Sequence, residues 1–249
     1  MKVKTILVSQ PEPKVENSPY AELEEKQKVK VDFIPFIHVE GVEAKHVRRQ
    51  KINLSDYTAI IMTSRNAVDH FFRIAEDMRY EVPVSLKYFC TSEAVAYYLQ
   101  KYVVYRKRKI YVGKRKIQDL APILKKFKGE KFLLPSSNML KPAIPKQLNK
   151  LGIDWKQAVF YKTVVSDLSH LEKVFYDVVV FFSPSGIKSL FENFPDFKQK
   201  NTRIAVFGNS TNKEAERHGL KVNIKAPTPD TPSMTMALEK YIKGQRQGK

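Results

Sequence analysis

Short runs of β-branched and aromatic residues alternate with amphipathic stretches of helical length along almost the whole chain. The predicted strands are Thr5–Ser9, Val31–Ile37, Thr58–Thr63, Tyr88–Thr91, Lys109–Val112, Lys131–Leu134, Ala158–Val165, Val178–Ser183, Ile204–Gly208 and Val222–Ala226. Segments with helical spacing lie between most of them, for example Ala94–Leu99 and Met236–Ile242. The run Val178–Phe182 is apolar at every position, which is typical of a strand with two buried faces. The pattern predicts an α/β protein with parallel sheets covered by helices on both faces.

Two parts of the chain resemble each other. Ala59–Val68 and Val178–Ile187 each combine a buried strand, a hydroxyl-rich turn and an amphipathic helix. A second similar pair, Tyr88–Ala94 and Ala205–Thr211, follows in the same order. Two similar α/β units explain both pairs, and chance similarity between buried strands is the alternative.

The sequence pattern allows two ways of dividing the chain between the two units. Val31–Val39 and Ala158–Val165 are long, β-rich and placed to bracket a middle segment. If these two runs lie side by side, residues from about 40 to 162 form an inserted domain. A simple division into an N-terminal and a C-terminal half is equally compatible with the pattern.

The chain is strongly basic, with a formal net charge of +18 over 249 residues. Such an excess favours an anionic partner, which could be a nucleic acid, an acidic membrane surface or a polycarboxylate metabolite. Cys90 is the only cysteine, so an intrachain disulfide and a thiolate metal cluster are excluded. The N-terminal residues lack the apolar stretch of a signal peptide, and no run approaches the ~20 apolar residues of a membrane span. We therefore expect a cytoplasmic protein that does not enter a membrane.

Several common catalytic motifs are absent. The sequence contains no Gly-x-Gly-x-x-Gly, no Gly-x-x-x-x-Gly-Lys-[Ser/Thr] and no Gly-x-Ser-x-Gly, so nucleotide-phosphate loops and an α/β-hydrolase elbow lack support. Its five histidines, His38, His46, His70, His170 and His218, do not have the spacing of zinc ligands. We expect no metal site.

Hydroxyl-rich turns at the ends of predicted strands are the remaining chemical feature. Ser183 followed by Pro184 is a favourable helix start, and Ser64, Ser92, Ser210 and Thr231 could cap helices in the same way. Capping alone is one interpretation. The other is that several helix N-termini at the carboxyl ends of parallel strands bind carboxylates or phosphates through backbone N–H groups.

Six segments, taken in order, resemble the uroporphyrinogen-III synthase family. They are Ile6–Pro11, Thr63–Val68, Phe160–Thr163, Phe182–Gly186, Gly208–Thr211 and Ala226–Thr231. The resemblance implies two doubly wound parallel-sheet domains joined by a two-stranded linker, one inserted in the other. Residues 1–36 and 166–249 would form the discontinuous domain, residues 40–158 the inserted domain, and residues 37–39 and 159–165 the linker strands.

The resemblance also implies a reaction. Members of this family close hydroxymethylbilane, a linear tetrapyrrole with eight carboxylates, and invert its last pyrrole ring with loss of water, without a metal or an organic cofactor. Tyr161 is then the candidate catalytic residue, because a protonated phenol could assist the leaving hydroxyl. The candidate carboxylate-binding residues are Thr63, Ser64, Ser183, Ser185, Ser210 and Thr211. We expect a monomer that receives the bilane from the upstream bilane-producing enzyme.

The chain departs from the family pattern at two turns. Gln10 stands where many members have an arginine, and Thr91 and Ser92 stand in a turn where glycine and threonine are frequent. Two other functions stay open. The basic stretch from Arg106 to Lys116, with its interleaved tyrosines, could bind nucleic acid, and two hinged α/β domains could bind a polyanion without catalysis.

Overall fold

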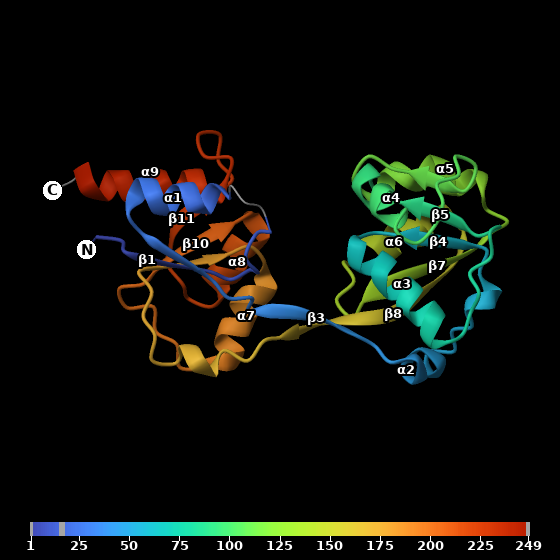
Figure 1. The fold of residues 1–249 in the computed structure, drawn as a ribbon, viewed down its shortest axis with the longest axis horizontal. Coiled ribbons are helices and arrows are strands. Elements are labelled where there is room, and N and C mark those ends of the chain that lie inside the picture. The colour runs from blue at the N-terminus through green and yellow to red at the C-terminus, as the bar shows by residue number, and fades with distance from the viewer. Residues whose placement is uncertain (1, 15–17, 248–249) are drawn as a thin grey trace. The chain divides into compact units, whose positions relative to one another are not determined.

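The computed structural model describes residues 2–14 and 18–247, which divide into two compact units. Unit 1 contains residues 2–14, 18–38 and 164–247, and unit 2 contains residues 39–163. Unit 1 is therefore built from both ends of the chain, and Figure 1 shows it in blue and in orange to red. Unit 2 lies within unit 1 in sequence and is described by itself below.

Unit 1 has a five-stranded parallel sheet with the strand order β11-β10-β9-β1-β2. Its strands are β1 (Thr5–Val8), β2 (Lys30–Phe33), β9 (Val178–Phe181), β10 (Arg203–Phe207) and β11 (Val222–Ala226). Helices α1 (Pro19–Gln27) and α9 (Met234–Gln247) pack side by side on one face of this sheet, and α7 (Pro184–Asn193) and α8 (Asn209–Arg217) cover the other.

Strand β9 shows why its sequence is apolar without alternation. Val178 and Val180 belong to the core under α1 and α9, whereas Val179 and Phe181 belong to the core under α7 and α8. Both faces of the strand are thus buried, as its sequence predicts. The prediction of parallel sheets covered on both faces is confirmed for this unit.

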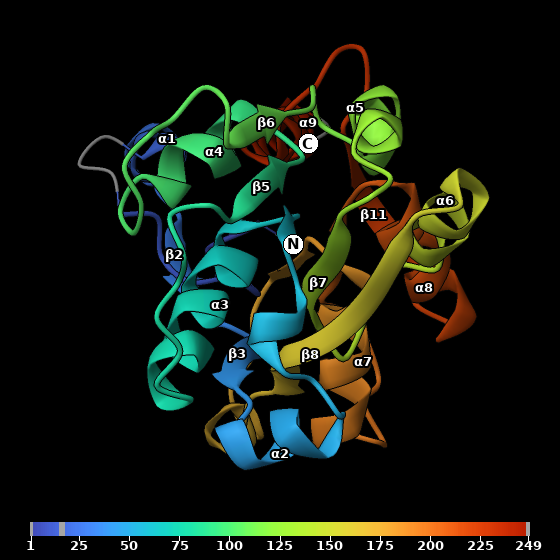
Figure 2. The same cartoon turned by 90° about the vertical axis from the view of Figure 1, so that its right-hand side faces the viewer.

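Unit 2 has the larger sheet, with the strand order β3-β8-β7-β4-β5-β6. Its strands are β3 (Ile37–Gly41), β4 (Ala59–Met62), β5 (Lys87–Cys90), β6 (Ile110–Val112), β7 (Lys131–Ser137) and β8 (Asp154–Val165), and a short helix, α2 (Ala44–Arg49), follows β3. Helices α3 (Arg65–Asp77) and α4 (Glu93–Leu99) cover one face, and α5 (Ala121–Lys126) and α6 (Ala143–Leu151) cover the other (Figure 2).

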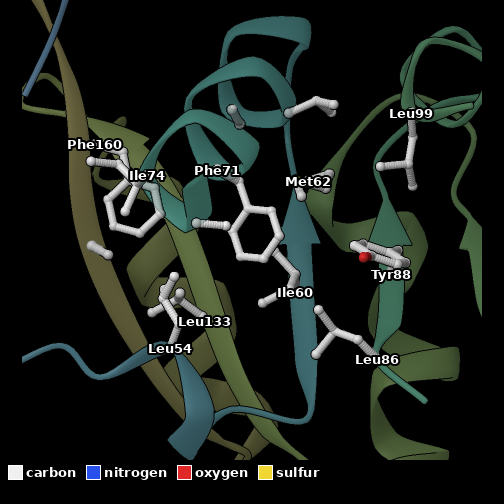
Figure 3. Packing of buried hydrophobic residues seen from close by; sticks show 14 of the residues in the cluster. Leu54, Ile60, Met62, Phe71, Ile74, Leu86, Tyr88, Leu99, Leu133 and Phe160 are labelled. Atoms are coloured by element: carbon white, nitrogen blue, oxygen red, sulfur yellow. The ribbon is translucent and has the colours of Figure 1, made fainter. Parts of the chain in front are cut away.

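Strand β4 lies between two cores in the same way. Ile60 and Met62 pack under α3 and α4, and Ala59 and Ile61 pack under α5 and α6. Figure 3 shows Phe71 of α3 directed at the sheet beside Ile60. At about 25 cal/mol per Å² of apolar area removed from water, burial on both faces supplies the main favourable term for each sheet.

Two predicted strands differ from their expected bounds. The single strand expected at Val31–Ile37 is wrong, because β2 ends at Phe33 and β3 begins at Ile37. Pro35 lies between them and has no N–H to donate to a strand ladder. Strand β8 begins at Asp154, earlier than the expected Ala158, because it pairs with β7 from Asp154 onward.

Strands β3 and β8 are neighbours in the sheet and run in opposite directions. The N–H of Val42 donates to the carbonyl of Phe160 at 2.9 Å, and the N–H of Ser166 donates to the carbonyl of Phe36 at 3.0 Å. One guanidinium nitrogen of Arg73 in α3 donates to the carbonyls of both Val42 and Phe160, at 2.8 and 3.0 Å. This side chain therefore ties the segment after β3 and strand β8 to α3 within unit 2.

Candidate active site

A pocket of about 450 Å³ opens in unit 2 where its parallel strands end. Thr63 follows β4, Thr91 follows β5 and Ser137 ends β7, and all three line the pocket together with Ser64 and Tyr161. The carboxyl edge of a parallel sheet is where open α/β folds bind their ligands. The structure thus brings Thr63, Ser64 and Tyr161, three of the residues singled out in the sequence, to one pocket.

Tyr161 lies in the wall of this pocket and is 7% exposed. Its hydroxyl is 3.4 Å from the hydroxyl of Ser64, and its ring stacks on the imidazole of His70 with centroids 5.0 Å apart. Burial raises the pKa of Tyr161 above its ordinary value of about 10, and the hydrogen bond with Ser64 lowers it by less. The phenol is therefore protonated at neutral pH and can act as a hydrogen-bond donor.

An irregularity in β8 determines the environment of Tyr161. The pairing of β7 with β8 shifts between Ser136, opposite Val159, and Ser137, opposite Tyr161. Such a bulge changes the direction of the residues that follow it. Ala158 and Phe160 face the α3 side as alternation requires, and Tyr161 packs into the same cluster although it comes directly after Phe160.

Ser64 has two roles in the geometry. It is the N-cap of α3, and its Oγ accepts a hydrogen bond from the N–H of Ala67 at 3.1 Å. The same Oγ lies 3.4 Å from the Tyr161 hydroxyl. Thr91 supports the neighbouring turn, because its hydroxyl donates to the carbonyl of Thr63 at 3.3 Å.

Unit 1 presents a similar turn after β9. Ser183 is the N-cap of α7, with Pro184 as its first helical residue, and Ser183 Oγ accepts from the N–H of Gly186 at 3.3 Å. The predicted helix start is confirmed here. Ser185 lies in the first turn of α7 and is half-buried.

The turn after β10 differs from its prediction. Gly208, with φ of +85°, is the N-cap of α8, so Ser210 lies inside the helix and does not cap it. Ser210 is exposed, whereas Thr211 is 1% exposed and its buried hydroxyl has no hydrogen-bond partner within residues 2–14 and 18–247. The side chain of Thr211, the third residue of α8, turns into the core, and its contact with a ligand stays a prediction.

Two further capping predictions are corrected by the structure. Ser92 occupies the N-cap position of α4 but makes no side-chain capping bond. Thr231 does not cap α9, since it is buried and its hydroxyl lies 2.6 Å from that of Thr228. Ser233 takes the capping role and accepts from the N–H of Met236 at 3.2 Å.

Sequence reasoning missed several residues of the unit 2 pocket. Arg115, Lys116 and Lys141 line it together with Ser136 and Ser137. Their position in the segments that follow two predicted strands was the available signal, because the carboxyl ends of neighbouring parallel strands meet at one edge. Arg115 and Lys116 belong to the basic stretch for which nucleic-acid binding was left open, and Lys141 was not singled out.

Residues 2–14 and 18–247 offer neither a metal-binding cluster nor a membrane-spanning helix. No group of three or more His, Cys, Asp or Glu side chains in this part of the chain could hold a metal ion. No helix in the same ranges has the length and apolar character needed to cross a bilayer.

Comparison with proteins of known sequence and structure gives a consistent result. The family model described as uroporphyrinogen-III synthase HemD matches residues 18–236. Uroporphyrinogen-III synthase of Chlorobaculum parvum is 24% identical over 257 residues, covering 97% of this chain and all of that protein. The Saccharomyces cerevisiae enzyme of the same name is 30% identical over 139 residues, and this chain spans 50% of its length.

Solved structures show the same fold. Uroporphyrinogen-III synthetase from Helicobacter pylori superposes with a TM-score of 0.63 at 18% identity, covering 96% of this chain and 99% of that one. A mutant uroporphyrinogen III synthase from Thermus thermophilus gives a TM-score of 0.59 at 14% identity, covering 98% of this chain and 99% of that one. The family model spans most of the chain, and the chain therefore belongs to the uroporphyrinogen-III synthase family.

Proposed function

We propose that this chain is a uroporphyrinogen-III synthase, a cofactor-independent lyase that closes hydroxymethylbilane with inversion of the last pyrrole ring and loss of water. One structural observation is the main support for the proposal. A protonated, buried phenol, that of Tyr161, lies 3.4 Å from the capping hydroxyl of Ser64 in the wall of a pocket lined by hydroxyls and cations.

Tyr161 is the proposed catalytic residue. Its hydroxyl donates a hydrogen bond to the terminal hydroxyl of the bilane, which weakens the C–O bond that breaks when water leaves. The azafulvene that remains is attacked at a substituted pyrrole carbon, and the spiro intermediate reopens and recloses in the inverted sense. Because spontaneous closure gives the isomer without inversion, the protein contributes chiefly by folding the bilane and stabilising charge.

The hydroxyl-bearing turns are the proposed carboxylate-binding groups. Thr63 and Ser64 supply them in unit 2, and Ser183, Ser185 and Ser210 supply them in unit 1. Helix α8 begins at Asn209 without a side-chain cap, so N–H groups of its first turn are available to an anion. Because the Thr211 hydroxyl is buried, we assign to Thr211 only a backbone contribution.

The setting of the reaction is part of the proposal. The enzyme works as a monomer in the reducing cytoplasm, where its single buried Cys90 stays a thiol. It takes the bilane from the enzyme that assembles it. Residues 37–39 and 159–165 act as linker strands between a discontinuous domain, 1–36 with 166–249, and an inserted domain, 40–158.

Separation of porphyrin isomers tests the proposal. Purified protein is incubated with freshly made hydroxymethylbilane, the products are oxidised, and types I and III are resolved by chromatography. We expect type III in excess over the spontaneous type I product, and the same rate after treatment with a metal chelator. Type I alone at the uncatalysed rate, from folded protein, would contradict the assignment, and loss of rate with chelator would contradict cofactor independence.

A further inference from the structure

The basic stretch from Arg106 to Lys116 is divided by strand β6 (Ile110–Val112). Lys107 and Arg108 come before Ile110, the first residue of β6, and Arg115 and Lys116 come after Val112, the last. The two clusters therefore lie toward opposite ends of a strand that runs parallel to β5 in the sheet of unit 2. The second cluster is at the carboxyl end, where the pocket of Thr63, Ser64 and Tyr161 opens.

Three cationic side chains line this pocket. Arg115 and Lys116 come from the segment after β6, and Lys141 comes from the segment between β7 and α6. All three are exposed, and within the described ranges none of them forms an ion pair. Their charges are therefore available to a ligand.

Hydrogen bonds fix the backbone of the segment that carries Arg115 and Lys116. The N–H of Gly113 donates to the carbonyl of Cys90 at 2.8 Å, and a Cβ at Gly113 would lie only 3.1 Å from the carbonyl oxygen of Thr91. The carboxylate of Asp119 then accepts from the N–H groups of both Arg115 and Lys116 at 2.8 Å. The same two hydrogen bonds lower the pKa of Asp119, so this brace is intact at neutral pH.

We infer that Arg115, Lys116 and Lys141 form a carboxylate-binding subsite that makes this enzyme selective for tetrapyrroles rich in acidic side chains. The inference rests on the proposed function for its substrate class. A guanidinium can bind a carboxylate through two parallel hydrogen bonds, and each ammonium adds a point charge with three donors. Three cations beside Tyr161 would hold the acetate and propionate groups of one end of the bilane near the reacting hydroxyl.

The inference predicts that removal of these three charges weakens substrate binding and largely preserves turnover. The variant carrying Arg115→Gln, Lys116→Gln and Lys141→Gln is compared with a control carrying Arg108→Gln, Lys107→Gln and Lys125→Gln. Each removes one arginine and two lysines, all exposed, and the control leaves the pocket intact. We expect KM for hydroxymethylbilane to rise at least roughly ten-fold in the first variant, with kcat within about three-fold and type III still formed. The control should stay within about two-fold, because its charges act only at long range.

Binding of stable porphyrins gives a readout that does not need turnover. Quenching of porphyrin fluorescence measures the affinity for uroporphyrin III, with eight carboxylates, and for coproporphyrin III, with four. The wild type and the control should prefer the octacarboxylate, and the pocket variant should lose at least half of that preference. Single substitutions replace the triple variant if its thermal unfolding midpoint falls.

The outcomes separate this inference from the proposed function. Equal KM values and equal porphyrin preference in the two triple variants would overturn the subsite while leaving the synthase assignment intact. A wild type that prefers uroporphyrin III but forms no type III isomer would instead overturn the proposed reaction. In that case, loss of the preference in the pocket variant alone would still support the subsite.

Discussion

The imidazole of His70 in α3 stacks on the phenol ring of Tyr161 in β8, with ring centroids 5.0 Å apart and an interplanar angle of 17°. Arg73 Nε donates to Nδ1 of His70 at 3.1 Å, which requires that nitrogen to be an acceptor and the ring to be neutral. Burial, and then the charge of Arg73, lower the pKa of His70, while Asp69 raises it by less. A neutral, oriented imidazole therefore fixes the plane of the candidate catalytic ring.

Acid should destabilise the protein through His70. The folded pKa lies below the ordinary value of about 6.5, so the unfolded chain binds the proton first as pH falls. The stability that neutral His70 contributes is present above pH of about 6.5 and is lost as pH falls through that value. Between pH 8 and 5, the unfolding free energy measured with denaturant should fall less steeply with falling pH for His70→Gln than for the wild type. Equal slopes of unfolding free energy against pH for His70→Gln and the wild type would contradict the assignment.

Tyr161→Phe should lower the rate of type III formation with little change in stability. The hydroxyl makes one long hydrogen bond, 3.4 Å to Ser64, so its loss should cost less than about 1 kcal/mol of unfolding free energy. We expect kcat to fall roughly 10- to 100-fold and KM to stay within about two-fold. Because burial raises the Tyr161 pKa, ionisation of this group should not reduce activity below pH of about 10.

Exposed Tyr97 provides the control for this substitution. Tyr97→Phe removes the same hydroxyl from a side chain that is 76% exposed and should keep the wild-type rate. Equal rates for the wild type and Tyr161→Phe, measured by isomer chromatography, would reduce Tyr161 to a packing residue.

Aspartate substitutions separate helix capping from substrate binding at Ser64 and Ser183. Aspartate is as good an N-cap as serine, so Ser64→Asp should keep the thermal unfolding midpoint, whereas Ser64→Ala should cost about 1 kcal/mol. The new charge in the pocket should repel the carboxylates of the substrate and raise KM roughly ten-fold. The same comparison at Ser183 tests the turn of unit 1. An unchanged KM in both aspartate variants would leave these serines as caps only.

Gly208→Ala should destabilise unit 1. Gly208 has φ of +85° and ψ of 153°, a region nearly restricted to glycine, so a side chain there should cost about 1–3 kcal/mol. Gly244→Ala, inside α9, is the matched change with the opposite expected sign. Apart from its chain neighbours and the backbone of its own helix, nothing lies within 4 Å of its new Cβ, and alanine in a helix gains up to about 1 kcal/mol over glycine. Denaturant midpoints of the two variants should therefore move in opposite directions.

Arg73→Ala should weaken the contact of α3 with strand β8 and with the segment after β3 in unit 2. The substitution leaves the carbonyls of Val42 and Phe160 without their guanidinium donor, which should cost about 2–4 kcal/mol of unfolding free energy. Exposed Arg48 in α2 gives a control, and Arg48→Ala should stay within about 0.5 kcal/mol. Hydrogen exchange should show faster exchange of the Val42 amide, which bonds to Phe160, only in the Arg73 variant. Unchanged exchange there would contradict the role assigned to Arg73.

Much of the secondary structure could be predicted because its signals are local. Apolar runs such as Val178–Phe181 became strands buried on both faces, and Ser64 and Ser183 capped helices as their positions in the chain indicated. The split of the run after Val31 was less visible, although Pro35 marked it. Local propensity and hydrogen bonding of a few consecutive residues were enough for these conclusions.

The candidate site depended on contacts between residues far apart in the chain. The bulge that brings Tyr161 into the cluster beside His70 arises from the pairing of β7 with β8, and the sequence around Tyr161 does not mark it. Thr211 is another example, since its hydroxyl suggested a ligand contact but the helix turns it into the core.

The basic residues also show which conclusions the sequence supports and which require the tertiary structure. By itself, the sequence determined that this is a basic α/β protein with a tyrosine, Tyr161, in a β-rich run and hydroxyls after its strands. Only the tertiary structure decided that Arg115, Lys116 and Lys141 join Tyr161 at one pocket while Arg108 does not. The physical reason is that strand order and register, which place distant segments side by side, are set by packing of the whole sheet.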